Sequence, residues 1–151
     1  PWEEVLALTR RAHVELLERV RALSDADLVD TERLPSRPGQ ALWRAIVGNG
    51  YTHPVIHIGQ VYLDQGLVEQ ATRLQEDTAR RVAALDEAPD WQGVAIYNLA
   101  CHYALCGRKA DAIERLTEAL RLNPGLTEWS RDDPDFAAIR EEPGYQALYG
   151  G

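Results

Sequence analysis

The chain has 151 residues, which is room for one ordinary domain or for two small packed modules. Its composition, 45% hydrophobic and 26% charged, is that of a globular protein, and no apolar run approaches the roughly 18 residues that a membrane helix needs. A formal net charge of −8 argues against nucleic acid as a partner, because such binding draws much of its free energy from Lys and Arg meeting phosphate. We therefore expect a globular protein that binds neither nucleic acid nor a membrane.

From Trp2 to Leu23, apolar residues recur at intervals of three and four, which predicts an amphipathic helix with one face turned toward a core. Ser24 and Asp27 then have the spacing of a capping box, which predicts a further short helical turn. The stretch "LPSRPGQ" that follows is typical of a loop. The apolar stripe of the first helix consists of Trp2, Leu6, Leu16, Leu17, Val20 and Leu23.

A second long helix is expected from about Gln40 to Gln65. Pro54 lies inside it, and its ring would clash with the carbonyl of Gly50, so we expect a kink or a restart there. A third helix should follow Gly66 and end before Pro89. Helices joined by short polar loops favour an antiparallel bundle.

The pattern that follows predicts a helical hairpin. One helix runs from about Trp91 to Leu105, the chain turns at Gly107, and a second helix returns from about Ala110 to Leu122. Alanines stand where the two helices approach closely, and larger side chains fill the space between them. This order of side chains resembles the tetratricopeptide repeat, a helix-turn-helix of roughly 34 residues. The matching positions are Leu99, Ala100, Tyr103, Ala112, Leu116, Ala119 and Pro124.

A single repeat cannot bury both of its faces, so its neighbours in the chain should cover it. We expect the third helix to cover one side and the C-terminal tail to cover the other. Asp133-Pro134 and Glu142-Pro143 are predicted helix starts in that tail. The expected fold is therefore all-α, with antiparallel helices in a DinB-like region of residues 1–88 and a tetratricopeptide-type hairpin with a short helical cap in residues 89–151. The apolar anchors of the cap are Phe136, Ile139, Tyr145 and Leu148.

The stretch "YTHPVIHIGQ" contains the candidate chemical site. At about 100° per residue, His53 and His57 share one helical face with Asn49, Gln60 and Asp64. Earlier in the same helix this face is apolar, so we expect the polar groups to point inward. Hydrogen bonds from the histidines to the backbone or to each other would explain the pattern without any ligand.

The alternative is a metal centre in which His13, central in the stripe of the first helix, adds a third imidazole to those of His53 and His57. Three histidines with one open coordination position suit zinc, nickel or another divalent ion that activates water or a thiol. Side chains behind the ligands would orient the imidazole rings. The candidates for that orienting role are Gln60, Asp64 and Asn49.

The first 66 residues also resemble the second half of a DinB-like four-helix bundle, a bacterial-type family. The resemblance implies that His53 and His57 are two metal ligands, as in the thiol transferases and isomerases of that family. The family's first two helices, with the usual third ligand, have no counterpart in this sequence. Either that half lies outside the sequence, or two chains pair to complete a bundle, or the polar face persists without its metal. The matching residues are Leu23 to Leu28, Trp43, Ile46, Gly48, Asn49, His53, His57 and Gln60.

The repeat resemblance implies a concave binding face on the first helix of the hairpin. That face is mostly apolar and lacks the Lys and Asn residues of a carboxylate clamp, so it favours an apolar helix or a second copy of the chain. Alternatively, the same side chains pack against the preceding helix. By position the face consists of Val94, Tyr97, Cys101, Ala104 and Leu105.

Two functions remain open: a protein-interaction or structural module, and a metal-dependent enzyme of the DinB-like type. No nucleophile or general base stands out in the sequence, which favours the module. The cysteines Cys101 and Cys106 would point about 140° apart on one helix and could not form a disulfide. No leader segment precedes the first helix, so we expect the cysteines to be reduced and the protein to be cytoplasmic.

Overall fold

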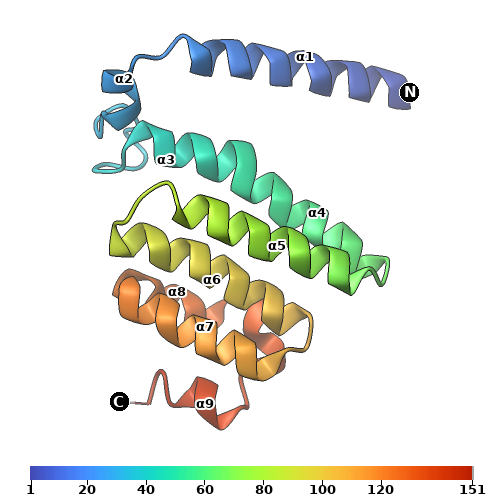
Figure 1. Ribbon diagram of the computed structural model, residues 1–151, viewed down its shortest axis with the longest axis vertical. Helices are drawn as coiled ribbons and strands as arrows, with labels where there is room; N and C mark the ends of the chain where they lie inside the picture. Colours follow the sequence, from blue (N-terminus) through green and yellow to red (C-terminus); the bar gives the residue numbers. More distant parts are fainter. Residues whose placement is uncertain (151) are drawn as a thin grey trace. The chain divides into compact units, whose positions relative to one another are not determined.

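The computed structural model describes residues 1–150 and is all-α, which confirms the predicted fold class (Figure 1). None of the helices in these residues is both long enough and apolar enough to cross a membrane. The chain divides into two compact units, Pro1–Gly50 and Tyr51–Gly151. The module boundary that the sequence suggested near residue 88 falls within the second unit, where the helices on either side of it pack together.

The first unit contains α1 (Trp2–Arg21), α2 (Asp25–Val29) and α3 (Leu42–Val47). The capping box before α2 forms as predicted: the Ser24 hydroxyl accepts from the Asp27 amide at 3.2 Å, and the Asp27 carboxylate accepts from the Ser24 amide at 2.9 Å. These bonds to Ser24, together with Arg33, lower the pKa of the Asp27 carboxyl. The turn is thus held by local polar contacts.

The apolar stripe of α1 is not turned toward a core, contrary to the prediction. No residue of this helix is buried, and Trp2 and Leu16 remain 68% and 49% exposed. Acidic side chains in the first turn and basic ones in the last turn complement the helix dipole. Periodicity therefore identified the residues that share a face, but it carried no information about what lies opposite that face.

A π-helical turn, Gly48–Thr52, leads into α4 (His53–Asp64), and Pro54 lies in the first turn of α4. This is the restart that the sequence predicted. Proline lacks an amide hydrogen and crowds the carbonyl four residues earlier, and a wider π turn relieves that contact. Gly66, with φ +74°, ends the segment and turns the chain back into the next helix.

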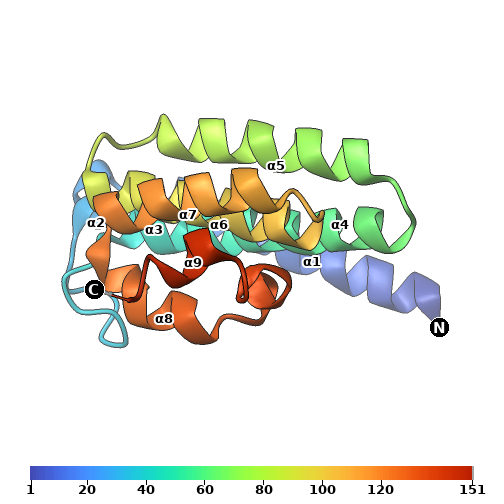
Figure 2. The ribbon, with the colours of Figure 1, turned by 90° about the horizontal axis from the view of Figure 1, so that it is seen from below.

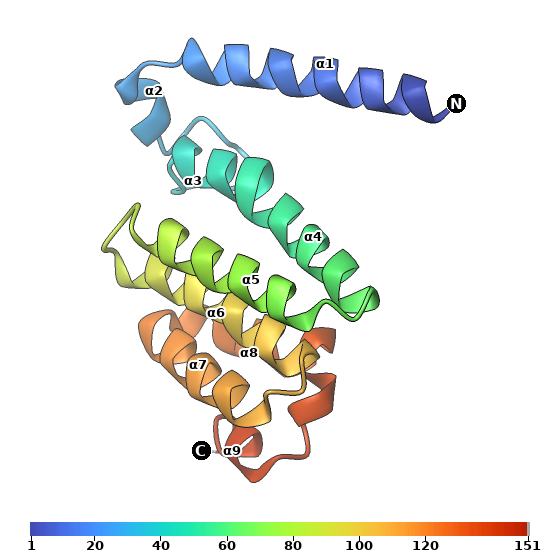
Figure 3. The same cartoon turned by 45° about the vertical axis from the view of Figure 1, so that its right-hand side comes forward.

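The rest of the second unit is a series of antiparallel helices. Each of α4, α5, α6 and α7 packs on the next, and these helices appear as successive layers in Figures 1 and 3. Figure 2 shows α8 and α9 on the side of α6 and α7 that lies away from α5. Beyond α4, the elements are α5 (Val68–Ala83), α6 (Pro89–Leu105), α7 (Lys109–Leu122), the 3₁₀ turn Pro124–Leu126, α8 (Thr127–Asp132), the 3₁₀ helix Pro134–Ile139 and α9 (Pro143–Gln146).

The main core lies between α6, α7 and the C-terminal tail. Gly107, with φ +75°, makes the turn between the two helices, as expected. The tail packs against α6, where the Phe136 ring meets the Tyr97 ring edge to face with centroids 5.5 Å apart. The Tyr145 hydroxyl donates to the Ser130 carbonyl at 2.9 Å and ties α9 to α8. Side chains with no exposed surface in this core are Ala100, Ala112, Leu116, Ala119, Phe136 and Ile139.

Candidate functional site

A groove of about 470 Å³ opens on the second unit. Its walls come mainly from α4, α6 and residues 133–135, while α5 and α8 contribute one side chain each. Trp129 is 70% exposed and Leu105 is 45% exposed. The lining residues are Ile56, His57, Gln60, Leu63, Gln75, Tyr97, Asn98, Cys101, His102, Leu105, Trp129, Asp133, Pro134 and Asp135.

Two carboxylates stand on one wall of this groove. Asp133 directly follows α8 and caps the next turn, where its carboxylate accepts from the Asp135 amide at 3.0 Å. Its other oxygen accepts from the Tyr97 hydroxyl at 2.6 Å. Burial and the neighbouring charge of Asp133 raise the pKa of the Asp135 carboxyl. The wall is therefore acidic, with Asp133 fixed in orientation by α6.

Cys101 lies beneath these carboxylates, with its thiol 4.0 Å from an Asp133 oxygen. Burial, followed by the negative charges of Asp133 and Asp135, raises the pKa of the thiol well above its ordinary value. One donor atom from each of the three side chains lies within 4.8 Å of the others, and no other such group of possible metal ligands occurs in residues 1–150. A protonated thiol is neither a good metal ligand nor a nucleophile.

The two histidines of "YTHPVIHIGQ" meet each other. Their Nε2 atoms are 3.0 Å apart, and their rings are edge to face, with centroids 4.5 Å apart. Contrary to expectation, their face of α4 points outward, and both side chains are exposed. The face that α4 buries carries Val55 and Gly59, because glycine lets the Gln75 side chain of α5 approach closely.

The residues predicted to orient these imidazoles bond elsewhere. The Gln60 amide donates to the Asp64 carboxylate at 2.8 Å, and the Asn49 amide donates to the Ala45 carbonyl at 3.0 Å. His13 lies on α1, in the first compact unit, and is exposed. The structure thus brings together the two histidines of α4, and within residues 1–150 neither forms a hydrogen bond with Asn49, Gln60 or Asp64.

The predicted interaction face is only partly in the groove. Tyr97, Cys101 and Leu105 line it, whereas Val94 does not and Ala104 is 1% exposed. The sequence interpretation missed the opposite wall on α4 and the contribution of α8. The tail that contains Asp133-Pro134 was expected to cover one side of the hairpin, but nothing in the sequence indicated that the Asp133 carboxylate would bond to Tyr97.

His102 lies between α5 and α6 and is 5% exposed, although it also belongs to the groove lining. Its Nε2 lies 3.0 Å from the Thr72 hydroxyl and 3.3 Å from the Cys106 sulfur. Burial lowers its pKa to about 4, so the imidazole is neutral near pH 7. These contacts give it a structural role at the helix interface.

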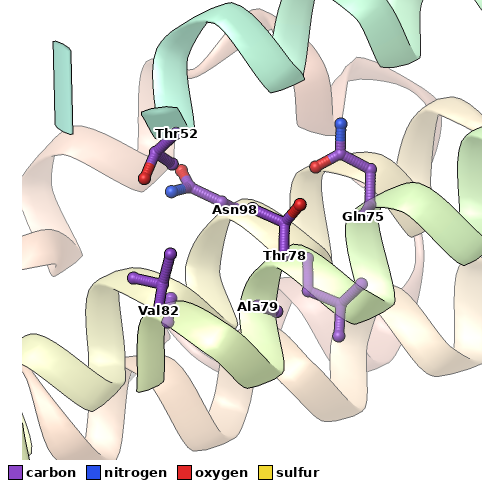
Figure 4. A pocket seen from close by; sticks show the side chains of 8 residues that line it. Thr52, Gln75, Thr78, Ala79, Val82 and Asn98 are labelled. Atoms are coloured by element: carbon purple, nitrogen blue, oxygen red, sulfur yellow. The ribbon is translucent and has the colours of Figure 1, made fainter. Parts of the chain in front are cut away.

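A second, much smaller cavity lies between α5 and α6, with a volume of about 10 Å³ (Figure 4). Thr52, Thr78 and Asn98 are among its lining residues, and within residues 1–150 the Thr78 hydroxyl has no hydrogen-bond partner. A cavity of this size has room for one water molecule at most, so it is not a ligand site.

No protein-family model matches the chain, and no curated protein or solved structure is significantly similar to it. The function is therefore inferred from the groove, the histidine pair and their chemistry.

Proposed function

We propose that this protein is a protein-interaction module of the tetratricopeptide type that holds a peptide or helix of its partner in the groove. The observation that carries the proposal is the origin of the groove walls. They come mainly from the alternate helices α4 and α6, whereas α5, which lies between them in the chain, adds a single side chain. Stacked helical hairpins form a concave face in this way, because the first helix of every pair lines the same side.

The chemistry of the groove supports binding over catalysis. It offers apolar surface from Ile56, Leu63 and Leu105 together with the exposed indole of Trp129. Large aromatic side chains supply much of the free energy at protein interfaces. The Cys101 thiol, whose raised pKa keeps it protonated, has no activated form for nucleophilic attack.

The test is selection of dodecamer peptides from a random displayed library on the immobilised protein, followed by affinity measurement on the selected sequences. We expect a shared sequence pattern, with binding weakened roughly tenfold by Leu105→Ala. Leu85→Ala is the matched control, because Leu85 is 54% exposed and does not line the groove. Failure to select any pattern, or equal binding by both variants, would contradict the proposal.

The histidine pair supports a second candidate, divalent metal binding of the DinB-like kind. In a tetrahedral zinc site with Zn–N bonds of about 2.0 Å, two ligand atoms lie roughly 3.3 Å apart. The 3.0 Å between the Nε2 atoms of His53 and His57 is close to that spacing. Both rings are exposed, so a second copy of the chain has access to complete the coordination.

Elemental analysis of protein purified without a histidine tag tests this candidate. About one ion of zinc or nickel per chain or per dimer, lost in His57→Ala, would support it. Cys101→Ser is the control for the Cys101–Asp133–Asp135 group and should keep the ion. Equal metal content in the wild type and in His57→Ala would exclude the pair as a metal site.

A further inference from the structure

We propose that the segment held in the groove carries a Lys or Arg side chain, whose cationic end is bound by Asp133 and Asp135 while the apolar part of the segment packs on Trp129 and Leu105. This inference rests on the proposed function and names the chemistry of the partner. Four observations carry it.

The first is the orientation of the carboxylates. Both line the groove, and Asp133 is held from two directions, by the Tyr97 hydroxyl at 2.6 Å and by the Asp135 amide at 3.0 Å. Each carboxylate oxygen has two acceptor positions, so these bonds leave acceptor capacity for a further donor. A carboxylate already fixed by its neighbours loses little conformational entropy when a ligand binds.

The second is the missing counter-charge. Within residues 1–150 neither Asp133 nor Asp135 forms an ion pair with a cationic side chain. Arg140 approaches Asp133, but its guanidinium donates to the backbone carbonyl at 3.0 Å. The raised pKa of Asp135 reflects its burial beside another negative group. An incoming ammonium or guanidinium would stabilise both charges.

The third observation is the charge of the other side chains that line the groove. Among the described residues of the groove, none is Lys or Arg. Of its two histidines, His102 is buried and neutral near pH 7. Asp133 and Asp135 would therefore repel an acidic segment, whereas a basic one is complementary to them.

The fourth is Trp129, which belongs to α8, the helix that Asp133 directly follows. Its indole is 70% exposed. A Lys or Arg side chain has a long apolar stem below its charge, and an aromatic face attracts both the stem and the cation. An apolar surface beside paired carboxylates thus suits this side chain better than a small ion.

Metal binding at the same carboxylates is the competing interpretation, and the contacts disfavour it. The Cys101 thiol would have to lose its proton in a buried, negatively charged setting. The Tyr97 hydroxyl already donates to one oxygen of Asp133. An organic cation requires neither change, because it needs only acceptor lone pairs.

The experiment uses libraries of dodecamer peptides in which one central position is fixed as Lys, Arg, norleucine or Glu and the other positions are random. Binding to the full chain is measured at low ionic strength and at high ionic strength. We expect the Lys and Arg libraries to bind roughly tenfold more tightly than the Glu library. The norleucine library should be intermediate, and added salt should reduce the difference.

Asp135→Asn is the decisive variant, because it removes charge with little change of shape. It should abolish the preference for Lys and Arg and leave the binding of the norleucine library unchanged. Asp135→Lys should reverse the preference toward Glu. Asp132→Asn is the matched control, since Asp132 is an exposed neighbour outside the groove lining. Circular dichroism of each variant establishes that it is folded.

The outcomes separate the two proposals. If peptides bind in a Leu105-dependent way but without preference for charge, the inference is wrong and the interaction module stands. If no library binds, both fail. If Zn²⁺ alone binds in a way that requires Cys101 and Asp135, and the peptides show no charge preference, the carboxylates form a metal site and the inference is overturned.

Discussion

His102 illustrates how one buried side chain couples the stability of this fold to pH. Its pKa falls to about 4 because burial disfavours the imidazolium. In the unfolded chain the group regains its ordinary value of 6.5. Between these values the unfolded state binds a proton that the folded state does not bind. The free energy of unfolding therefore decreases as the pH falls through this window, and this contribution is fully present above it.

We predict that His102→Gln weakens this pH dependence, because glutamine keeps a polar group near Thr72 but does not titrate. Urea unfolding at pH 7 and at pH 4.5 should show that the wild type loses more stability than the variant, by on the order of 1 kcal/mol. Other groups titrate equally in both proteins, so the difference isolates this side chain. Identical pH dependence would mean that His102 is accessible to protonation in the folded state.

At the scale of the elements, the close approach of α6 and α7 depends on Gly93. A Cβ at this position would lie 2.6 Å from the Asn123 Cβ and 3.0 Å from the Ala119 carbonyl oxygen. Asn123 is itself tied to α6 through a 3.1 Å hydrogen bond from its amide to the Asp90 carbonyl. α6 and α7 therefore cannot move apart at this point without breaking the Asn123–Asp90 hydrogen bond.

Gly93→Ala should therefore destabilise the protein by about 1–3 kcal/mol, even though alanine is the better helix former. Gly59→Ala is the matched comparison, because the added Cβ would meet the end of the flexible Gln75 side chain rather than backbone. Its loss in the free energy of unfolding should be smaller in the same urea titration. A larger loss at Gly59 would show that the α4–α5 contact is the more rigid of the two.

At the scale of the whole molecule, burial is distributed very unevenly among the helices. α6 carries Trp91, Tyr97 and Tyr103 among its buried side chains, whereas α1 has no buried residue. Local opening of a helix costs less free energy when it breaks fewer buried contacts. The two helices should therefore differ in the lifetime of their backbone hydrogen bonds.

Amide hydrogen exchange followed by mass spectrometry should accordingly find the slowest exchange in α6 and α7 and the fastest helical exchange in α1. Dilution of the protein provides the control, because protection that depends on concentration indicates association. If α1 exchanged as slowly as α6, its apolar stripe would be covered in solution. A concentration dependence of that protection would identify a second copy as the cover, as the sequence interpretation allowed.

Local patterns in the sequence determined the helices themselves. The capping box of Ser24, the restart at Pro54 and the turn at Gly107 depend on interactions within a few residues, so each could be recognised without a partner. The alternation of Ala100, Ala112 and Leu116 likewise predicted a close antiparallel hairpin, because side-chain size limits how near two helices can come.

Only the tertiary structure decided which helical faces meet and what the groove contains. His53 and His57 share a face, as predicted, but Gly59 permits a closer approach to α5, so that face of α4 is buried and the histidine face is exposed. Asp133, which lies between α8 and the next 3₁₀ helix, bonds to Tyr97 of α6. Periodicity is a property of one helix, whereas burial depends on the shape of its neighbours, and this is why the acidic wall of the groove could not be predicted from the sequence.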